Sequence, residues 1–217
     1  MDSSSDISVQ FQDALLSLLS HPYLKIVLVG SMQDQVVPIY SAIISGILHP
    51  RILRALYIEG EVYEPNHFLI RLVLFSFKLL NLGLSDHGLL IHLSQVLAGN
   101  FWQGEGHSRI YEELDVFLLS LQYLFETPPF GSFKVIKTTT VYDDIKKEWI
   151  LNTPRLLNNP YHLPWAVRGI WDDPRILNDP NLANELHQLQ ALFDQWRPTT
   201  AKLKEIKYRL EPLKARL

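Results

Sequence analysis

The chain has no cysteine among its 217 residues, and this absence excludes disulfide bonds, thiolate zinc sites and a cysteine nucleophile. The glycine-rich phosphate-binding patterns G-x-x-x-x-G-K-[ST] and G-x-G-x-x-G are also absent, as is the zinc-binding pattern H-E-x-x-H. His87 and His92 are five residues apart, a spacing that puts them on different faces of a helix. A net charge of −3 provides no basic field for nucleic acid. We therefore predict no cofactor, no metal and no nucleic-acid partner.

Long hydrophobic runs are few. The chain begins with polar and acidic residues, unlike the basic and apolar start of a secretory signal. The most apolar stretch, residues 68–80, is interrupted by Arg71 and Lys78 and is shorter than the roughly 20 residues that a membrane-spanning helix needs. These features predict an intracellular protein, cytoplasmic or at a membrane surface, and not a secreted one.

What the sequence does contain is an alternation of strand and helix patterns. Residues 24–29 form a β-branched apolar run, typical of a buried parallel strand. A helical segment at 39–48 and a second apolar run at 53–58 complete a predicted strand–helix–strand unit. Further helices are predicted at 10–19, 65–80, 85–97, 110–125, 182–196 and 202–217, with a weak strand at 135–142 followed by a proline-rich connector.

Asp34 follows the first predicted strand after one short loop. Sites in α/β proteins lie at the carboxyl ends of the strands, and a carboxylate there can accept the N–H of a catalytic histidine. The alternative is a structural aspartate that closes the turn within G-x-x-D-x-x-V-P.

His107 lies in the segment Gly104-Glu105-Gly106-His107-Ser108-Arg109, just before the helix predicted at 110–125. An imidazole with an ordinary pKa of about 6.5 suits proton transfer near neutral pH. A single histidine is as readily a surface or capping residue. The pair Asp34 and His107 is a stronger signal, since the two residues stand in this chain order and are separated by a predicted strand and helices.

This order resembles the last two members of the Ser…Asp…His triad of the α/β-hydrolase superfamily. Val-Gly-Ser-Met-Gln-Asp-Gln-Val-Val-Pro at 29–38, Gly-Glu-Gly-His-Ser-Arg at 104–109 and Asn-Pro-Tyr-His-Leu-Pro-Trp at 159–165 resemble fungal lipase-like serine esterases. The resemblance implies an ester or lipid substrate, Asp34 as the triad acid and His107 as the general base. It implies the C-terminal portion of an α/β-hydrolase fold, with few parallel strands and many helices.

The catalytic serine of that family has no counterpart here. A nucleophile elbow needs very small residues two positions before and two after the serine. Ser31 has Val29 and Gln33 at these positions, Ser108 has Gly106 but also Ile110, and the other serines fail in the same way. Only 33 residues precede Asp34, too few for the crossovers that usually separate it from an earlier strand.

We therefore expect a hydrolase part that supplies the acid and base but is inactive alone. The alternative is a noncatalytic hydrolase scaffold that binds a partner or a membrane surface, favoured by the apolar helix at 68–80 and the basic tail. The expected organisation is a partial core at 1–127, with a helical insertion at about 61–99, and a connector with a helical extension at 128–217. The helical insertion is either a cap over the site or core packing. The missing strands would leave an open sheet edge and favour self-association.

Overall fold

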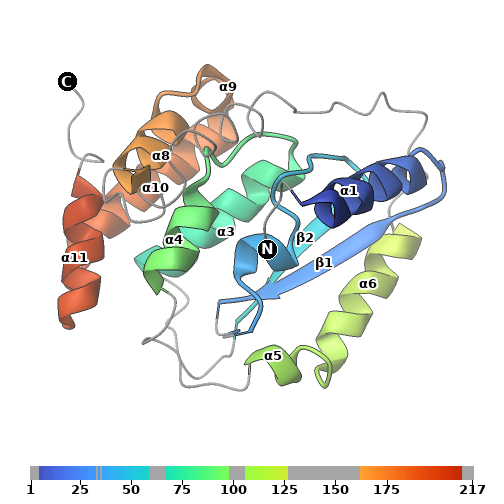
Figure 1. Cartoon of the computed structure of the whole chain (residues 1–217). Helices are drawn as coiled ribbons and strands as arrows, with labels where there is room; N and C mark the ends of the chain where they lie inside the picture. The colour runs from blue at the N-terminus through green and yellow to red at the C-terminus, as the bar shows by residue number, and fades with distance from the viewer. Residues whose placement is uncertain are drawn as a thin grey trace.

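The computed structural model describes residues 5–32, 34, 36–58, 67–97, 106–126 and 162–211. Helices gather around a short sheet (Figure 1). In chain order the elements are α1 (Asp6–Leu19), β1 (Ile26–Ser31), α2 (Ile39–Ala42), β2 (Ile52–Tyr57), α3 (Phe68–Asn81), α4 (Leu89–Leu97), α5 (Gly106–Arg109), α6 (Leu114–Glu126), α8 (His162–Trp171), α9 (Pro174–Leu177), α10 (Pro180–Gln195) and α11 (Ala201–Arg209). The predicted strand at 135–142 lies outside the described residues.

The sheet confirms the predicted strand–helix–strand unit. β1 and β2 are parallel, with Ile26 opposite Ile52 and Ser31 opposite Tyr57, and they are the two strands found within the described ranges. α2 connects them and lies close to β1 at Gly30, where an added Cβ would be 3.1 Å from a methyl group of Ile43. The chain is therefore a helix-rich α/β structure with few parallel strands, as predicted.

α2 is shorter than the predicted helix at 39–48, and a buried arginine explains why. The backbone turns at Ile44, which has a positive φ of 47°. The side chain of Arg54, from β2, donates hydrogen bonds to the carbonyl oxygens of Ile43, Ile44 and Ile47. A buried cation needs such acceptors, and a continued helix would have used these carbonyls itself. Burial lowers the pKa of Arg54 to about 10, so the group stays charged near neutral pH.

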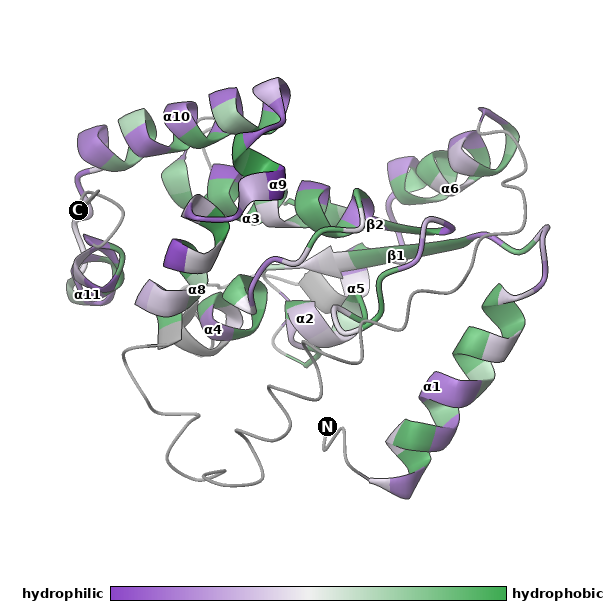
Figure 2. Cartoon of the chain, turned by 90° about the horizontal axis from the view of Figure 1, so that it is seen from above, coloured by the Kyte–Doolittle hydropathy of each residue, from purple (hydrophilic) through white to green (hydrophobic). Residues whose placement is uncertain are grey.

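α1 and α6 lie on opposite faces of the sheet (Figure 2). α1 packs Leu15 and Leu19 in a small cluster with Ile52 and with the partly buried Leu28. The carbonyl of Leu19, at the C-terminal end of α1, and that of His21, two residues further on, accept hydrogen bonds from the buried guanidinium of Arg51. On the other face, Lys25 donates to the carbonyls of two residues near the C-terminal end of α6.

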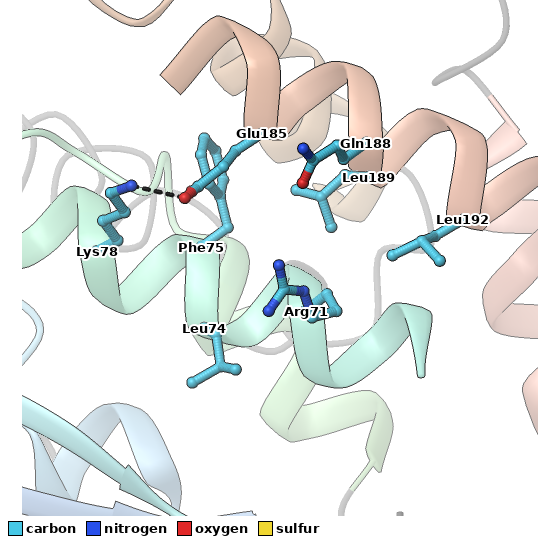
Figure 3. A pocket seen from close by; sticks show the side chains of 8 residues that line it. All are labelled: Arg71, Leu74, Phe75, Lys78, Glu185, Gln188, Leu189 and Leu192. Carbon is cyan, nitrogen blue, oxygen red and sulfur yellow. Dashed lines mark hydrogen bonds and ion pairs between the residues drawn. The ribbon is translucent and has the colours of Figure 1, made fainter. Parts of the chain in front are cut away.

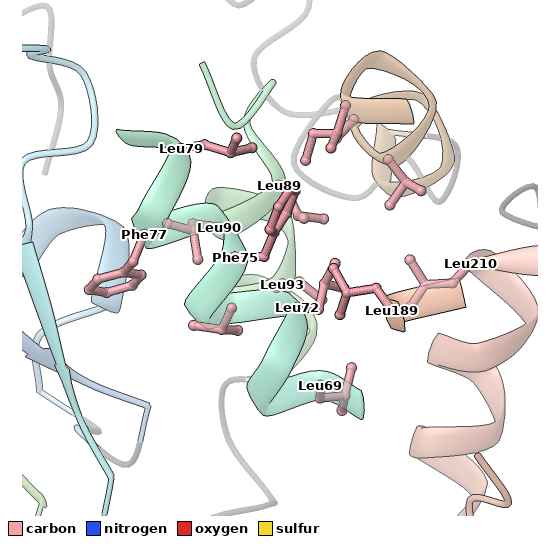
Figure 4. Packing of buried hydrophobic residues seen from close by; sticks show 14 of the residues in the cluster. Leu69, Leu72, Phe75, Phe77, Leu79, Leu89, Leu90, Leu93, Leu189 and Leu210 are labelled. Carbon is pink, nitrogen blue, oxygen red and sulfur yellow. The ribbon is translucent and has the colours of Figure 1, made fainter. Parts of the chain in front are cut away.

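The main core is built around α3, ten of whose residues are buried. Figure 4 shows its leucine and phenylalanine side chains among those of α4, α10 and the chain after α11. The same cluster includes α2 and α8, so α3 serves as core packing, one of the two roles expected for this segment. No helix within the described ranges is both long enough and apolar enough to cross a bilayer.

The proline-rich connector is partly helical, which the sequence interpretation missed. α8 begins at His162 with Pro164 in its first turn, and α9 and α10 begin at Pro174 and Pro180. Proline is tolerated in a first turn because the N–H groups there have no partner within the helix. Asp173 and Asp179 cap α9 and α10 through their side chains.

Candidate functional site

Asp34 lies three residues beyond the end of β1 and is partly buried. Its Oδ1 accepts hydrogen bonds from the N–H groups of Val36, at 2.8 Å, and Val37, at 2.9 Å. These bonds close the turn, as the structural interpretation of this aspartate requires. Both bonds are accepted by the same carboxylate oxygen. The role of Asp34 as a triad acid stays a prediction.

The backbone of His107 belongs to α5, but its side chain lies outside the described residues. The distance between the imidazole and the Asp34 carboxylate therefore stays a prediction as well. The position of α5 follows from its neighbours.

Two tethers orient the chain after α5. The hydroxyl of Tyr57, the last residue of β2, donates to Glu113 at 3.2 Å, just before α6 begins. Lys25, just before β1, donates to the carbonyls of Tyr123, at 3.2 Å, and Leu124, at 3.1 Å. α6 therefore runs from the carboxyl end of the sheet to its amino end. α5 lies at the carboxyl end, as both views show (Figures 1 and 2). The loop after β1, which contains Asp34, leaves the sheet at that same end.

A second histidine–aspartate pair was not predicted. Nε2 of His87 lies 3.3 Å from Oδ2 of Asp173, which is buried and also accepts two hydrogen bonds from the guanidinium of Arg175. The Arg175 side chain holds the pKa of Asp173 well below its ordinary value. The only local signal was the Asp-Pro pair at 173–174, typical of a helix start.

This second pair is built as a clamp and not as an acid–base group. His87 has a positive φ of 52°, and its ring lies against Gly169 of α8, where an added Cβ would be 2.7 Å from Nδ1. One ring nitrogen thus faces Asp173 and the other faces the backbone of α8, so neither is directed to a substrate. The clamp joins the turn before α4 to the corner between α8 and α9.

Asp86, beside the clamp, is a buried carboxylate. It accepts hydrogen bonds from the N–H groups of Gly88, at 3.0 Å, and Leu90, at 2.9 Å, and so caps the start of α4. Burial raises the pKa of Asp86, and these backbone hydrogen bonds partly oppose that increase. The helix predicted at 85–97 therefore begins later, at Leu89, and Asp86 lies in the turn before it.

A shallow cavity lies apart from the Asp34 loop, between α3 and α10 (Figure 3). The ion pair of Lys78 with Glu185, 2.6 Å apart, closes one side, and Arg71 and Leu189 contribute to its walls. Its volume of about 110 Å³ is small, and its lining residues all belong to α3 and α10. Elsewhere in the described ranges, no group of three His, Asp or Glu side chains could hold a metal ion.

Comparison with family models identifies the fold. The model described as "YMC0/YMC35 alpha/beta hydrolase domain" matches residues 1–174. The chain belongs to this alpha/beta hydrolase family. The match confirms the superfamily resemblance and covers the Asp34 loop, α5, α6 and the His87–Asp173 clamp, whereas α10 and α11 of this YMC0/YMC35 family member lie beyond it. The comparisons with curated proteins and with solved structures gave no match.

Proposed function

We propose that this chain supplies the acid and the base of a serine ester hydrolase, and that a serine on another stretch of polypeptide completes the triad. The observation that carries the proposal is that, in an alpha/beta hydrolase domain, the Asp34 loop begins at the carboxyl end of the sheet and α5 lies at that same end. That end is where α/β folds assemble their sites.

In the proposed reaction His107 takes the proton of the serine hydroxyl while the serine oxygen attacks the ester carbonyl. Asp34 accepts the other N–H of the imidazole and stabilises the imidazolium that forms. The imidazolium then gives its proton to the leaving alcohol, which leaves an acyl-serine. Water attacks this ester, with His107 again as the base, and releases the acid.

The absence of a suitable serine in the sequence leads to a clear expectation. The 217-residue chain alone hydrolyses p-nitrophenyl butyrate no faster than buffer and is not labelled by a fluorophosphonate probe, which reacts with activated serines. Labelling of a serine in this chain, together with turnover that disappears in His107→Ala, would show that the nucleophile is already present.

The second candidate is a noncatalytic hydrolase scaffold that binds a partner or a membrane surface. Large apolar side chains on the outer surfaces of α1 and α6 favour a partner. The basic tail is weaker support for a membrane surface, because two of its cations already have partners within the chain. Lys207 donates to the carbonyl of Trp196, and Arg209 pairs with Glu205. Flotation with vesicles of anionic phospholipid tests membrane contact, and a chain that stays at the bottom of the gradient would remove it.

A further inference from the structure

The outer edge of β1 has the properties of a pairing edge. The N–H of Ile26 donates to the carbonyl of Arg51, at 2.8 Å, so Ile26 and every second residue after it face β2. The backbone groups of Val27 and Val29 therefore point to the opposite edge, where no strand lies within the described ranges. Charged residues and proline usually protect an edge strand from pairing. The strand sequence Ile-Val-Leu-Val-Gly-Ser contains neither.

α6, which contacts β1, presents an exposed apolar stripe. Its inner face, with Val116, Leu119 and Tyr123, is partly buried, and no residue of the helix is fully buried. The outer stripe is formed by side chains at helical spacing that are between 43% and 79% exposed: Leu114, Phe117, Leu118, Leu121, Leu124 and Phe125. The charged residues of α6 itself are Asp115 and Glu126, both acidic, so the charge of the helix opposes an anionic membrane as its cover.

α1 presents a similar stripe on the other face of the sheet. Ile7, Phe11 and Leu18 lie on one side of the helix and are between 55% and 79% exposed. With the six residues of α6, nine large apolar side chains lie exposed on the two helices that cover the faces of the sheet. Taken at about 80 Å² each, the nine side chains expose roughly 700 Å² per copy. If all of them enter the interface, two copies bury about 1,400 Å², within the range of about 1,200–2,000 Å² for stable interfaces.

We infer that this face, formed by the β1 edge and the two outer stripes, binds a second copy of the chain. A two-fold axis normal to the sheet brings the two β1 strands together antiparallel, with Leu28 at the axis and Val27 opposite Val29 of the second copy. Because this axis is normal to the sheet, the two α1 helices lie on one face of the joined sheet and the two α6 helices on the other. α1 of one copy therefore meets α1 of the second copy, and α6 meets α6. The face is thus complementary to itself, as an isologous interface must be, and the sheet grows to four strands.

Sedimentation velocity of the full chain tests this inference. We expect a species of about twice the 25.1 kDa chain mass at micromolar concentration. Phe117→Glu with Leu121→Glu, both on exposed positions of the outer stripe, yields a monomer that melts cooperatively. The matched control Gln122→Glu changes the charge outside the stripe and leaves the dimer intact.

Hydrogen exchange gives a readout that does not depend on a variant. The amides of Val27 and Val29 exchange slowly in the dimer and become faster on dilution. A monomeric wild type, open-ended aggregates, or a dimer that persists in the double variant would overturn the inference. The measurements use the 217-residue chain by itself and do not depend on the serine, so a monomeric chain would overturn this inference and leave the proposed function standing.

Discussion

Gly169 of α8 is the position where one added methyl group should be most informative. An alanine Cβ there would lie 2.7 Å from Nδ1, 2.8 Å from Cγ and 3.1 Å from Cβ of His87. Atoms so near the histidine backbone cannot swing away, and the residue is already held at a φ of 52°. Overpacking of this kind costs about 1–3 kcal/mol, against a gain of up to about 1 kcal/mol from replacing glycine in a helix.

We therefore expect Gly169→Ala to lower the free energy of unfolding by about 1–2 kcal/mol, because the clash outweighs the helix propensity. For a chain of this length the melting temperature should fall by roughly 2–8 °C, measured by circular dichroism. In a His87→Gly background the ring is gone, and the same substitution should be neutral or stabilising. An equal effect of Gly169→Ala in both backgrounds would refute the reasoning.

Three further predictions concern buried or tethering groups. Asp173→Asn should lower the melting temperature at pH 7, and the difference should shrink below about pH 4. The reason is that a depressed carboxyl pKa stabilises the fold fully above the pKa of the unfolded state, and this stabilisation is lost progressively as the pH falls toward the lower pKa of the folded state. Arg51→Met should reduce the free energy of unfolding in urea by at least about 2 kcal/mol, because the carbonyls of Leu19 and His21 lose their buried donor. Tyr57→Phe should speed hydrogen exchange in residues 106–113, with a stability loss below about 1.5 kcal/mol, because it removes only the hydrogen bond to Glu113.

Controls for these variants are available in the chain. Asp172→Asn, at an exposed neighbour of Asp173, should change the melting temperature little at any pH. Arg168→Met, at an exposed arginine, should cost far less than Arg51→Met. A pH-independent loss in Asp173→Asn would contradict the assigned role of the carboxylate. Unchanged exchange in Tyr57→Phe would show that the Glu113 tether does not hold the chain after α5.

Local sequence patterns predicted most helices and strands, but they did not predict which face of each element is buried. The strands at 24–29 and 53–58 lie within two residues of β1 and β2, because their apolar runs are bounded by polar residues and turns. The helix predicted at 110–125 was also correct in type, but much of the stripe that revealed it points to solvent. α6 has apolar residues on two faces, and periodicity alone does not say which face meets the sheet.

Long-range partners account for what the sequence interpretation missed. α2 ends early because Arg54, ten residues beyond Ile44, takes carbonyls that a helix would need. The His87–Asp173 clamp joins residues 86 apart, and no local pattern reveals that contact. For Asp34 the sequence supported two roles, and the hydrogen bonds to Val36 and Val37 are visible while the catalytic role stays a prediction.

The central claim is that the carboxylate of Asp34 meets the imidazole of His107. Nuclear magnetic resonance of a chain labelled at histidine measures this contact through the titration of the His107 ring. A carboxylate within about 4–6 Å favours the imidazolium, so Asp34→Asn should lower the titration midpoint by about one pH unit or more. The control Asp115→Asn, at the start of α6, should leave it unchanged. A His107 titration identical in Asp34→Asn and the wild-type chain would contradict the account.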